Sequence, residues 1–243
     1  LGFKHYQARE IPDDRELRDL YIDRIYDTYI DEEELQACDH VTQEIADMLE
    51  PGPRSSRSYI KAMGKWLSEG NAKKQGSLVQ ECYEQGVPIF CPAFSDCSAG
   101  FGLVKHQVER IKANKPYLSI DSVADFRELT DIKIKAGTTG LFMVGGGVPK
   151  NFAQDTVVCA EILGEEVPMH AYAVQITVAD VRDGACSSST LKEACSWGKV
   201  DVALEQMVYA EASTVAPVIV SDVYHRRAWE NRPRHRYGDM FKD

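Results

Sequence analysis

The chain has 243 residues, of which 44% are hydrophobic and 27% are charged. This length suits one large domain or two small ones, and the composition is that of an ordinary soluble protein. The 28 Lys and Arg residues against 38 Asp and Glu residues give a net charge of −10. That balance argues against a nucleic-acid binder, which normally presents a basic surface, and no run approaches the ~20 apolar residues of a membrane-spanning helix.

The chain contains seven cysteines, and no two of them form a C-x-x-C pair. An odd number without metal-ligand spacing favours reduced thiols over a disulfide framework, so we expect a cytoplasmic protein. The first residue is Leu rather than Met, which is typical of a truncated or processed product.

The N-terminal part is acidic and has a helical pattern. Apolar side chains recur at helical spacing over 17–25 and again over 35–49. The sequence Pro-Gly-Pro at 51–53 then breaks the pattern. We therefore expect an acidic helical segment over 1–54. Two more helices are predicted after it, one capped by Ser55 or Ser56 and one beginning at Ser77.

From Gly86 onwards the pattern changes to strand, loop and helix. Continuous apolar strands that alternate with helices indicate a parallel sheet covered on both faces. We therefore predict an α/β fold with a doubly wound, Rossmann-like, mostly parallel sheet, whose core is 55–243 within a single domain over 1–243. The predicted strands are 87–90, 117–120, 139–144, 172–178 and 207–210.

Ligands of such sheets bind at the carboxyl ends of the strands. The sequence Gly-Gly-Gly at 145–147 follows a predicted strand there and allows close approach of the backbone to a ligand. It does not have the G-x-G-x-x-G spacing, and a tight strand-to-helix turn explains it about as well. Asp96 and Glu211 also follow strands, where each can bind a ribose hydroxyl or cap the following helix.

The segment 183–199 carries the most distinctive chemistry. Glu193 and Trp197 are four residues apart on a predicted helix that starts at Thr190, so they share one face. A carboxylate beside an indole suits an organic cation, and Lys199, just after Gly198, can become a nucleophile when it is partly desolvated. A surface helix with an ordinary terminal lysine is the competing interpretation.

Three stretches of the chain resemble the deoxyhypusine synthase family. They are Val-Pro-Ile-Phe-Cys-Pro-Ala-Phe-Ser-Asp-Cys-Ser at 87–98, Thr-Gly-Leu-Phe-Met-Val-Gly-Gly-Gly-Val-Pro-Lys at 139–150, and Glu-Ala-Cys-Ser-Trp-Gly-Lys at 193–199. Tyr-Ala-Glu-Ala-Ser at 209–213 follows at the distance typical of the family. The similarity extends from about residue 55 to the end, and Ser-Trp-Gly-Lys in this setting is its most specific part.

The resemblance implies an NAD-dependent transfer of an aminobutyl group from spermidine to an amine, with the group carried as a covalent imine on a lysine that Lys199 matches. It also implies a homotetramer with active sites between paired subunits. The cofactor positions are matched by Asp96, Thr177, Val178, Glu211 and Ala212, with Glu211 in place of an aspartate. The substrate positions are matched by Gly146, Asn151, Glu193 and Trp197.

The chain departs from the family at three positions. Asn151 stands where the motif has a catalytic histidine, and Phe101 and Cys186 stand where it has acidic polyamine ligands. We therefore expect an aminobutyl transferase that acts on a small polyamine and a small amine acceptor, such as a homospermidine-forming enzyme, rather than on a protein lysine. An impaired paralogue that binds polyamine or an active partner subunit, and an imine-forming NAD enzyme with another substrate, are the alternatives. The resemblance further implies that an N-terminal part with cofactor contacts is missing.

Overall fold

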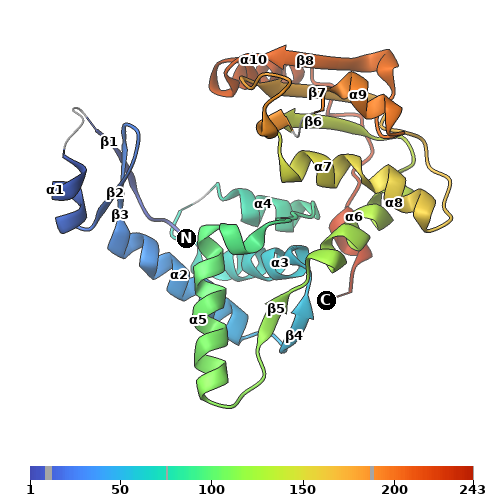
Figure 1. Ribbon diagram of the computed structural model, residues 1–243. Helices are drawn as coiled ribbons and strands as arrows, with labels where there is room; N and C mark the ends of the chain where they lie inside the picture. The colour runs from blue at the N-terminus through green and yellow to red at the C-terminus, as the bar shows by residue number, and fades with distance from the viewer. Residues whose placement is uncertain (9–12, 75, 187–188, 243) are drawn as a thin grey trace. The chain divides into compact units, whose positions relative to one another are not determined.

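The computed structural model describes residues 1–8, 13–74, 76–186 and 189–242. Its residues group into two compact units (Figure 1). Unit 1 comprises Leu1–Asp121 together with Arg236–Asp243, and unit 2 comprises Ser122–His235. The single NAD-binding domain expected over 1–243 stays a prediction.

Unit 1 begins with a small antiparallel sheet that the helical spacing did not predict. Its order is β1-β3-β2, with β1 at His5–Gln7, β2 at Ile22–Ile25 and β3 at Thr28–Asp31. The helix expected over 17–25 is only α1 (Asp14–Asp19), because Tyr21 and Tyr26 adopt positive φ angles of 56° and 54° and turn the chain. The second expected helix is confirmed as α2 (Glu32–Asp47), which the side chain of Asp31 caps.

The rest of unit 1 packs helices around two short parallel strands. The strands are β4 (Gly52–Arg54) and β5 (Leu118–Ile120). The helices are α3 (Ser56–Trp66), α4 (Leu78–Gln85) and α5 (Ser98–Lys112). Ser55 and Ser77 cap α3 and α4 with their side chains, as the sequence predicts.

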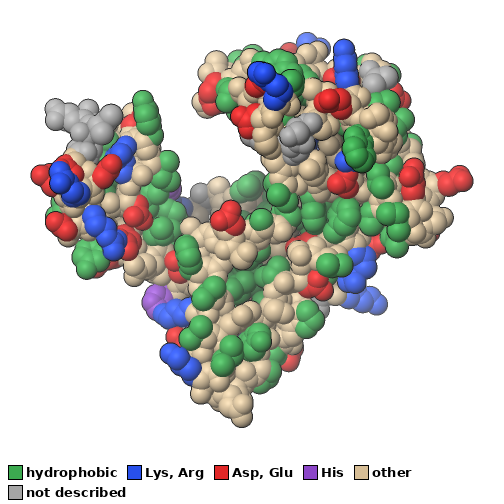
Figure 2. Space-filling view, in the orientation of Figure 1, with side chains coloured by type: hydrophobic (Ala, Val, Ile, Leu, Met, Phe, Trp, Pro, Cys, Tyr) green, Lys and Arg blue, Asp and Glu red, His purple; other side chains and the backbone are tan. Residues whose placement is uncertain are grey.

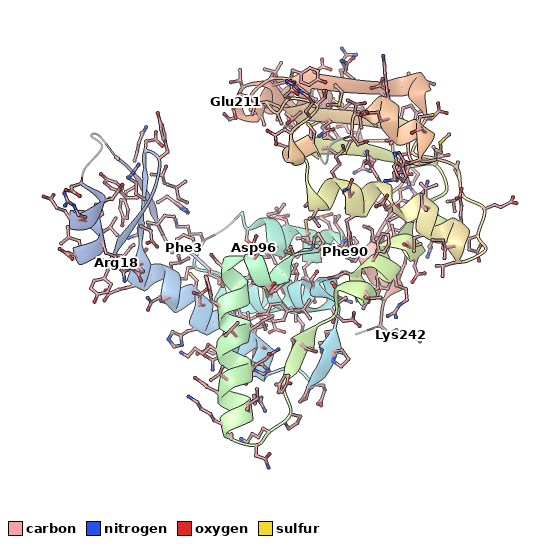
Figure 3. All side chains as sticks on the ribbon, viewed as in Figure 1. Phe3, Arg18, Phe90, Asp96, Glu211 and Lys242 are labelled. Carbon is pink, nitrogen blue, oxygen red and sulfur yellow. The ribbon has the colours of Figure 1, made fainter. Side chains whose placement is uncertain are left out.

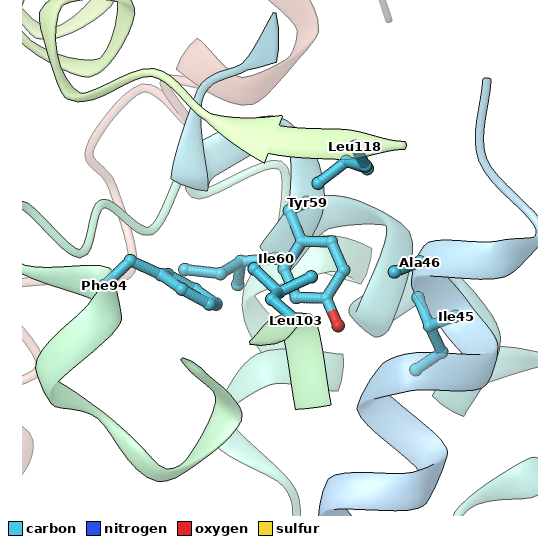
Figure 4. Packing of buried hydrophobic residues seen from close by; sticks show 7 residues of the cluster. All are labelled: Ile45, Ala46, Tyr59, Ile60, Phe94, Leu103 and Leu118. Atoms are coloured by element: carbon cyan, nitrogen blue, oxygen red, sulfur yellow. The ribbon is translucent and has the colours of Figure 1, made fainter. Parts of the chain in front are cut away.

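The core of unit 1 joins α2, α3 and α5 to β5. Figure 4 shows the ring of Tyr59 at its centre, with Phe94 in edge-to-face contact at 5.5 Å between ring centroids. The hydroxyl of Tyr59 donates a hydrogen bond to the Thr42 carbonyl oxygen at 2.6 Å, so this fully buried tyrosine is satisfied. The other core residues are Ile45, Ala46, Ile60, Leu103 and Leu118.

The strand predicted over 87–90 is wrong, because those described residues pair with no other strand. Instead, the segment before it contacts the last residues of the chain. The carbonyl oxygen of Gly86 accepts a hydrogen bond from the amide of Gly238 at 2.8 Å. Arg236 donates to the carbonyl oxygen of Glu84 at 2.9 Å. A long-range contact of this kind leaves no periodic signal in the sequence.

Unit 2 contains a three-stranded parallel sheet in the order β6-β7-β8. Its strands are β6 (Gly140–Val144), β7 (Tyr172–Thr177) and β8 (Glu205–Tyr209), all three close to their predicted positions. The flanking helices are α6 (Ser122–Ala136), α7 (Val148–Gln154), α8 (Thr156–Ile162), α9 (Leu191–Ser196) and α10 (Ala212–His225). Parallel sheets flanked by helices confirm the predicted Rossmann-like α/β class.

The two faces of this sheet differ in how well they are covered. On one face, Leu191 and Ala194 of α9 pack with Met143 of β6 and Ala173 of β7. On β6, the alternate residues Phe142 and Val144 are 53% and 56% exposed. Helix α10 packs against β7 but has no buried residue. Hydrophobic side chains therefore reach the surface of this unit, and Figure 2 shows them on the visible face among acidic and basic ones.

All seven cysteines lie in described segments and carry free thiols. Across the part of the chain that the structure describes, His, Cys, Asp and Glu side chains form no group of three that could hold a metal ion. In the same residues, none of the helices combines the length and the apolar character that crossing a bilayer requires.

Candidate active site

Lys199 lies in unit 2, between α9 and β8, where two backbone hydrogen bonds hold it. Its amide donates to the carbonyl oxygen of Ala194 at 3.1 Å, and its own carbonyl oxygen accepts from the amide of His170 at 3.0 Å. Gly198 precedes it with a φ of 71°, so this glycine ends the helix as the sequence predicts. Because Val200 then pairs with His170 ahead of β7, Lys199 lies at the amino ends of β7 and β8.

The side chain of Lys199 is only 16% exposed. Its ammonium lies 2.5 Å from the Oδ1 atom of Asp155 and 5.3 Å from the centroid of the Trp197 ring. The predicted neighbourhood of Trp197 and Lys199 is thus present as a cation–π contact. Asp155 was not among the predicted residues. Its place at the end of α7, four residues after Asn151, was the signal that could have suggested it.

Glu193 is engaged in the start of α9. Its Oε2 atom accepts from the Thr190 amide at 2.5 Å, and the Thr190 hydroxyl accepts from the Glu193 amide at 3.2 Å. This reciprocal capping box confirms the predicted helix start. The hydrogen bond from the Thr190 amide lowers the pKa of the Glu193 carboxyl. Trp197 caps the other end of the helix and is 67% exposed, and its role with Glu193 as a cation site stays a prediction.

A second lysine, Lys150, supports the loop before α9. It is 2% exposed, and its ammonium donates to the carbonyl oxygens of Cys186, at 2.7 Å, and of Ser189. Burial lowers the pKa of this lysine. Cys186 itself is completely buried, with its thiol toward the Ala179 carbonyl oxygen at 3.8 Å. Sequence reasoning did not assign a role to Lys150.

A buried hydrogen-bond chain lies behind Lys199. Lys133 donates to the hydroxyl of Thr139 at 2.7 Å, which lies 2.8 Å from Nδ1 of His170. Nε2 of His170 lies 3.1 Å from the carbonyl oxygen of Ala153. Since a carbonyl only accepts, Nε2 carries the proton and Nδ1 accepts from Thr139. Burial, aided by the positive charge of Lys133, lowers the pKa of His170 to about 4, so this histidine is neutral at pH 7.

Four of the predicted cofactor residues lie together at the carboxyl ends of β7 and β8. Thr177 pairs with Tyr209 and is 6% exposed. Its carbonyl oxygen accepts a hydrogen bond from the Ala210 amide at 3.1 Å. Val178 follows it and is exposed. Glu211, labelled in Figure 3, caps α10 by accepting from the Thr214 amide at 3.2 Å, and Ala212 is the first residue of that helix. Glu211 also accepts from the hydroxyl of Ser213, and this contact lowers the pKa of its carboxyl.

The glycine turn lies at the carboxyl end of β6, next to this group. Gly145 and Gly147 have positive φ angles of 80° and 75°, and no atom lies within 4 Å of the place where a Cβ would stand. The Gly145 amide donates to the Ile176 carbonyl oxygen at 2.8 Å, which fixes the turn to β7. Gly146 lies in this turn, and Asn151 follows in α7. The turn is therefore open on the side where a Cβ of Gly145 or Gly147 would stand.

Asp96 and Phe101 belong to unit 1. Asp96, labelled in Figure 3, ends a short 3-10 helix (Phe94–Asp96) just before α5. Cys97 takes the cap position of α5 without a side-chain hydrogen bond, so the alternative of Asp96 as the helix cap is wrong. Phe101 is exposed on α5. A shared site of Asp96 with the residues of unit 2 stays a prediction.

Within unit 2, Lys199 and the cofactor candidates lie at opposite ends of the sheet. The carbonyl oxygen of Lys199 accepts a hydrogen bond from the amide of His170, just before β7 begins. Glu211 lies two residues after Tyr209, which pairs with Thr177 at the end of β7. A strand advances ~3.3 Å per residue, so the backbone from residue 170 to residue 177 spans about 23 Å. One copy of unit 2 therefore keeps its lysine far from its own cofactor candidates.

Unit 1 contains a separate cavity of about 250 Å³ between α3, α4 and the last residues of the chain. Its lining is partly charged, with Arg57, Lys61 and Arg236, and partly apolar, with Ile60 and Val79. None of the predicted site residues lines this cavity.

Comparison with known proteins gives the following similarities. The family model described as deoxyhypusine synthase matches residues 1–223. The deoxyhypusine synthase-like protein of Caulobacter vibrioides is 74% identical over 241 residues, which is 99% of this chain and 66% of that protein. The protein of the same description from Coxiella burnetii is 68% identical over 242 residues, covering 100% of this chain and 68% of that protein. The probable deoxyhypusine synthase 2 of Methanosarcina mazei is 39% identical over 227 residues, 93% of this chain and 64% of that protein. The chain thus spans about two thirds of the length of these relatives.

Proposed function

Because this chain belongs to the deoxyhypusine synthase family, we propose that it forms part of an NAD-dependent transferase that moves an aminobutyl group between amines through an imine on Lys199. The observation that carries the proposal is the setting of that lysine. Its backbone is held by Ala194 and His170, its ammonium contacts Asp155, and the Trp197 ring lies 5.3 Å away. A fixed, mostly buried amine beside an aromatic ring suits covalent chemistry on a cationic substrate.

The residues at the carboxyl ends of β7 and β8 suit the cofactor. The Oε2 atom of Glu211 accepts hydrogen bonds from the Ser213 hydroxyl and the Thr214 amide at the start of α10. A carboxylate so placed after a strand can accept ribose hydroxyl groups. At Gly145 and Gly147 no atom lies within 4 Å of the place where a Cβ would stand, so a ligand can approach the backbone of the turn there. When bound there, NAD supplies a hydride acceptor for the carbon next to a substrate amine.

The acceptor is a small amine rather than a protein lysine, and the substrate a small polyamine. Cys186 replaces a family carboxylate and is fully buried, so this position offers no charge to a second ammonium group. Phe101 is likewise apolar and exposed. Each lost charge-assisted hydrogen bond removes about 1.5–3 kcal/mol of binding free energy, which favours substrates different from those of deoxyhypusine synthesis. Gly146, Asn151, Glu193 and Trp197 contact the polyamine in this proposal.

The active protein is a cytoplasmic homo-oligomer, a tetramer with sites between paired subunits. The separation of about 23 Å along β7 between Lys199 and the cofactor candidates supports a site that combines the lysine of one copy with the cofactor of another. Exposed apolar side chains on β6 and α10, among them Phe142 and Val218, suit a contact between copies.

Chemical trapping tests the function. The intact protein is incubated with NAD and spermidine, putrescine or agmatine, reduced with borohydride, and digested for mass analysis. An aminoalkyl adduct on Lys199 that requires NAD is expected. Lys199→Ala must abolish it, while Lys192→Ala, at an exposed position on α9, must leave it intact. Absence of an adduct with every donor would contradict the proposal.

The second candidate is a non-catalytic paralogue that binds polyamine or an active partner subunit. It is favoured by Asn151 in place of a histidine and by the engagement of the Glu193 carboxylate in the cap of α9. In that case the protein binds a polyamine without NAD turnover, and Lys199→Ala leaves its binding unchanged.

A further inference from the structure

The ion pair between Lys199 and Asp155 differs from an ordinary surface contact because both backbones are fixed. Asp155 lies at the junction of α7 and α8, where its amide donates to the Asn151 carbonyl oxygen at 2.8 Å and its carbonyl oxygen accepts the Cys159 amide at 2.9 Å. Exposed ion pairs between flexible side chains contribute little to stability. Here the lysine is mostly buried and its partner is 38% exposed, so the carboxylate can be reached by a small substrate.

The other groups near the ammonium of Lys199 are less suited than Asp155 to take its protons. The Trp197 ring has no acceptor, and the Lys150 ammonium donates to two carbonyl oxygens of the preceding loop. The Glu193 carboxylate caps α9. Among the described residues, Asp155 is the one whose carboxylate contacts Nζ of Lys199.

We propose that Asp155 is a catalytic residue that relays protons from Nζ of Lys199 to the amine that leaves. This inference rests on the proposed transferase function, because only a lysine that forms an imine needs such a relay. The separation of 2.5 Å between Nζ and Oδ1 is within reach of direct proton transfer.

The step is an exchange of one imine for another. The substrate carbon is double-bonded to the nitrogen of the departing amine. Nζ forms a double bond to that carbon, and the two bonds from the carbon to the departing nitrogen break with their electrons left on that nitrogen. Nζ starts as an ammonium with three protons and ends as a protonated imine with one. The two protons that it loses pass through the Asp155 carboxylate to the departing nitrogen, so atoms and charge balance.

The variant Asp155→Asn tests the relay because the amide keeps the size of the side chain but cannot accept the proton. In the intact protein, NADH absorbance reports the oxidation that produces the substrate imine, and borohydride trapping reports transfer to Lys199. We expect the variant to form NADH as the native protein does and to form the lysine adduct about 10²–10⁴ times more slowly. The residual adduct formation should rise with pH, because Nζ must then lose its proton to solvent. Asp155→Glu should restore part of the rate.

Asp13→Asn is the matched control, because Asp13 forms an exposed ion pair with Arg15 in unit 1 and asparagine can still cap α1. It should change neither signal. An adduct rate in Asp155→Asn equal to that of the native protein overturns the relay. Loss of both signals together with a lower unfolding temperature assigns Asp155 a structural role and also overturns it. If the native protein itself forms NADH but no adduct, or neither, the proposed function fails instead, so the two failures are distinguishable.

Discussion

The buried ammonium of Lys150 lies 2.7 Å from the carbonyl oxygen of Cys186, so a lysine of α7 holds the loop that leads into α9. Its second acceptor is the carbonyl oxygen of Ser189. Burial lowers the pKa of this lysine, which shows the cost of placing a charge there. Lys150 therefore connects two carbonyl oxygens that precede α9 to α7.

Replacing Lys150 by Met should loosen this loop. The variant keeps the volume but removes the donor of the Ser189 carbonyl oxygen and leaves the Cys186 carbonyl oxygen with the Ser189 amide alone. We expect the free energy of unfolding to fall by about 1–3 kcal/mol. Urea unfolding measures this change, and hydrogen exchange at the amides of Cys186 and Ser189 should become faster. Lys192→Met, at an exposed position on α9, should change neither. Unchanged exchange in Lys150→Met would contradict the supporting role.

Acid should destabilise the protein through His170. This histidine has a pKa of about 4 in the folded state and an ordinary value of 6.5, because burial opposes its charge. Between these values the unfolded chain binds a proton that the folded chain does not, so stability is lost as the pH falls from about 6.5 to 4. The difference corresponds to at most about 3 kcal/mol. Urea unfolding at several pH values should show this slope, and His170→Gln should flatten it. A slope unchanged in that variant would exclude His170 as its source.

The contact between α2 and α5 requires a glycine. A Cβ on Gly102 would lie 1.8 Å from the hydroxyl oxygen of Thr42 and 2.5 Å from the carbonyl oxygen of Asp39. Gly102→Ala should therefore reduce the free energy of unfolding by about 1–3 kcal/mol, despite the better helix propensity of alanine. Gly184→Ala serves as the control, since no atom lies within 4 Å of its Cβ position. Equal melting temperatures for the two variants would show that the helices separate easily.

Glu211 should contribute to NAD affinity through its charge. Glu211→Gln keeps an oxygen that can cap α10 but removes the carboxylate offered to the ribose. We expect calorimetry to show NAD binding weaker by about 10-fold to 100-fold, the equivalent of one charge-assisted hydrogen bond. Asp201→Asn changes a cap of a short 3-10 helix (Val202–Leu204) at the amino ends of the strands, and it should bind NAD normally. Equal affinities in the two variants would place the ribose elsewhere.

The parts of the fold that depend on local chemistry could be predicted from sequence. Ser55 and Ser77 cap their helices and Gly198 ends α9, because a cap or a left-handed residue needs only its neighbours. The turns at Tyr21 and Tyr26 escaped prediction because residues other than glycine rarely adopt positive φ angles.

Some of the positions at the candidate site were predictable in the same way. The motif placed Trp197 beside Lys199, and four cofactor candidates do lie together in unit 2. Asp155 was missed because its contact with Lys199 joins residues far apart in the chain, and such a contact leaves no spacing pattern. The capping role of Glu193 was missed although Thr190 three residues earlier is its sequence signature.

The distance along β7 between Lys199 and the residues near Thr177 has a genetic consequence. If each reaction centre combines the lysine of one copy with the cofactor of another, two defective alleles can complement each other within a mixed oligomer. A chain that lacks Lys199 would still contribute its cofactor-binding residues to a centre shared with another copy. A chain altered at Glu211 would still contribute its lysine. Mixed oligomers would then contain some centres in which both contributions are intact, and inheritance of two different defects would be milder than inheritance of either one twice.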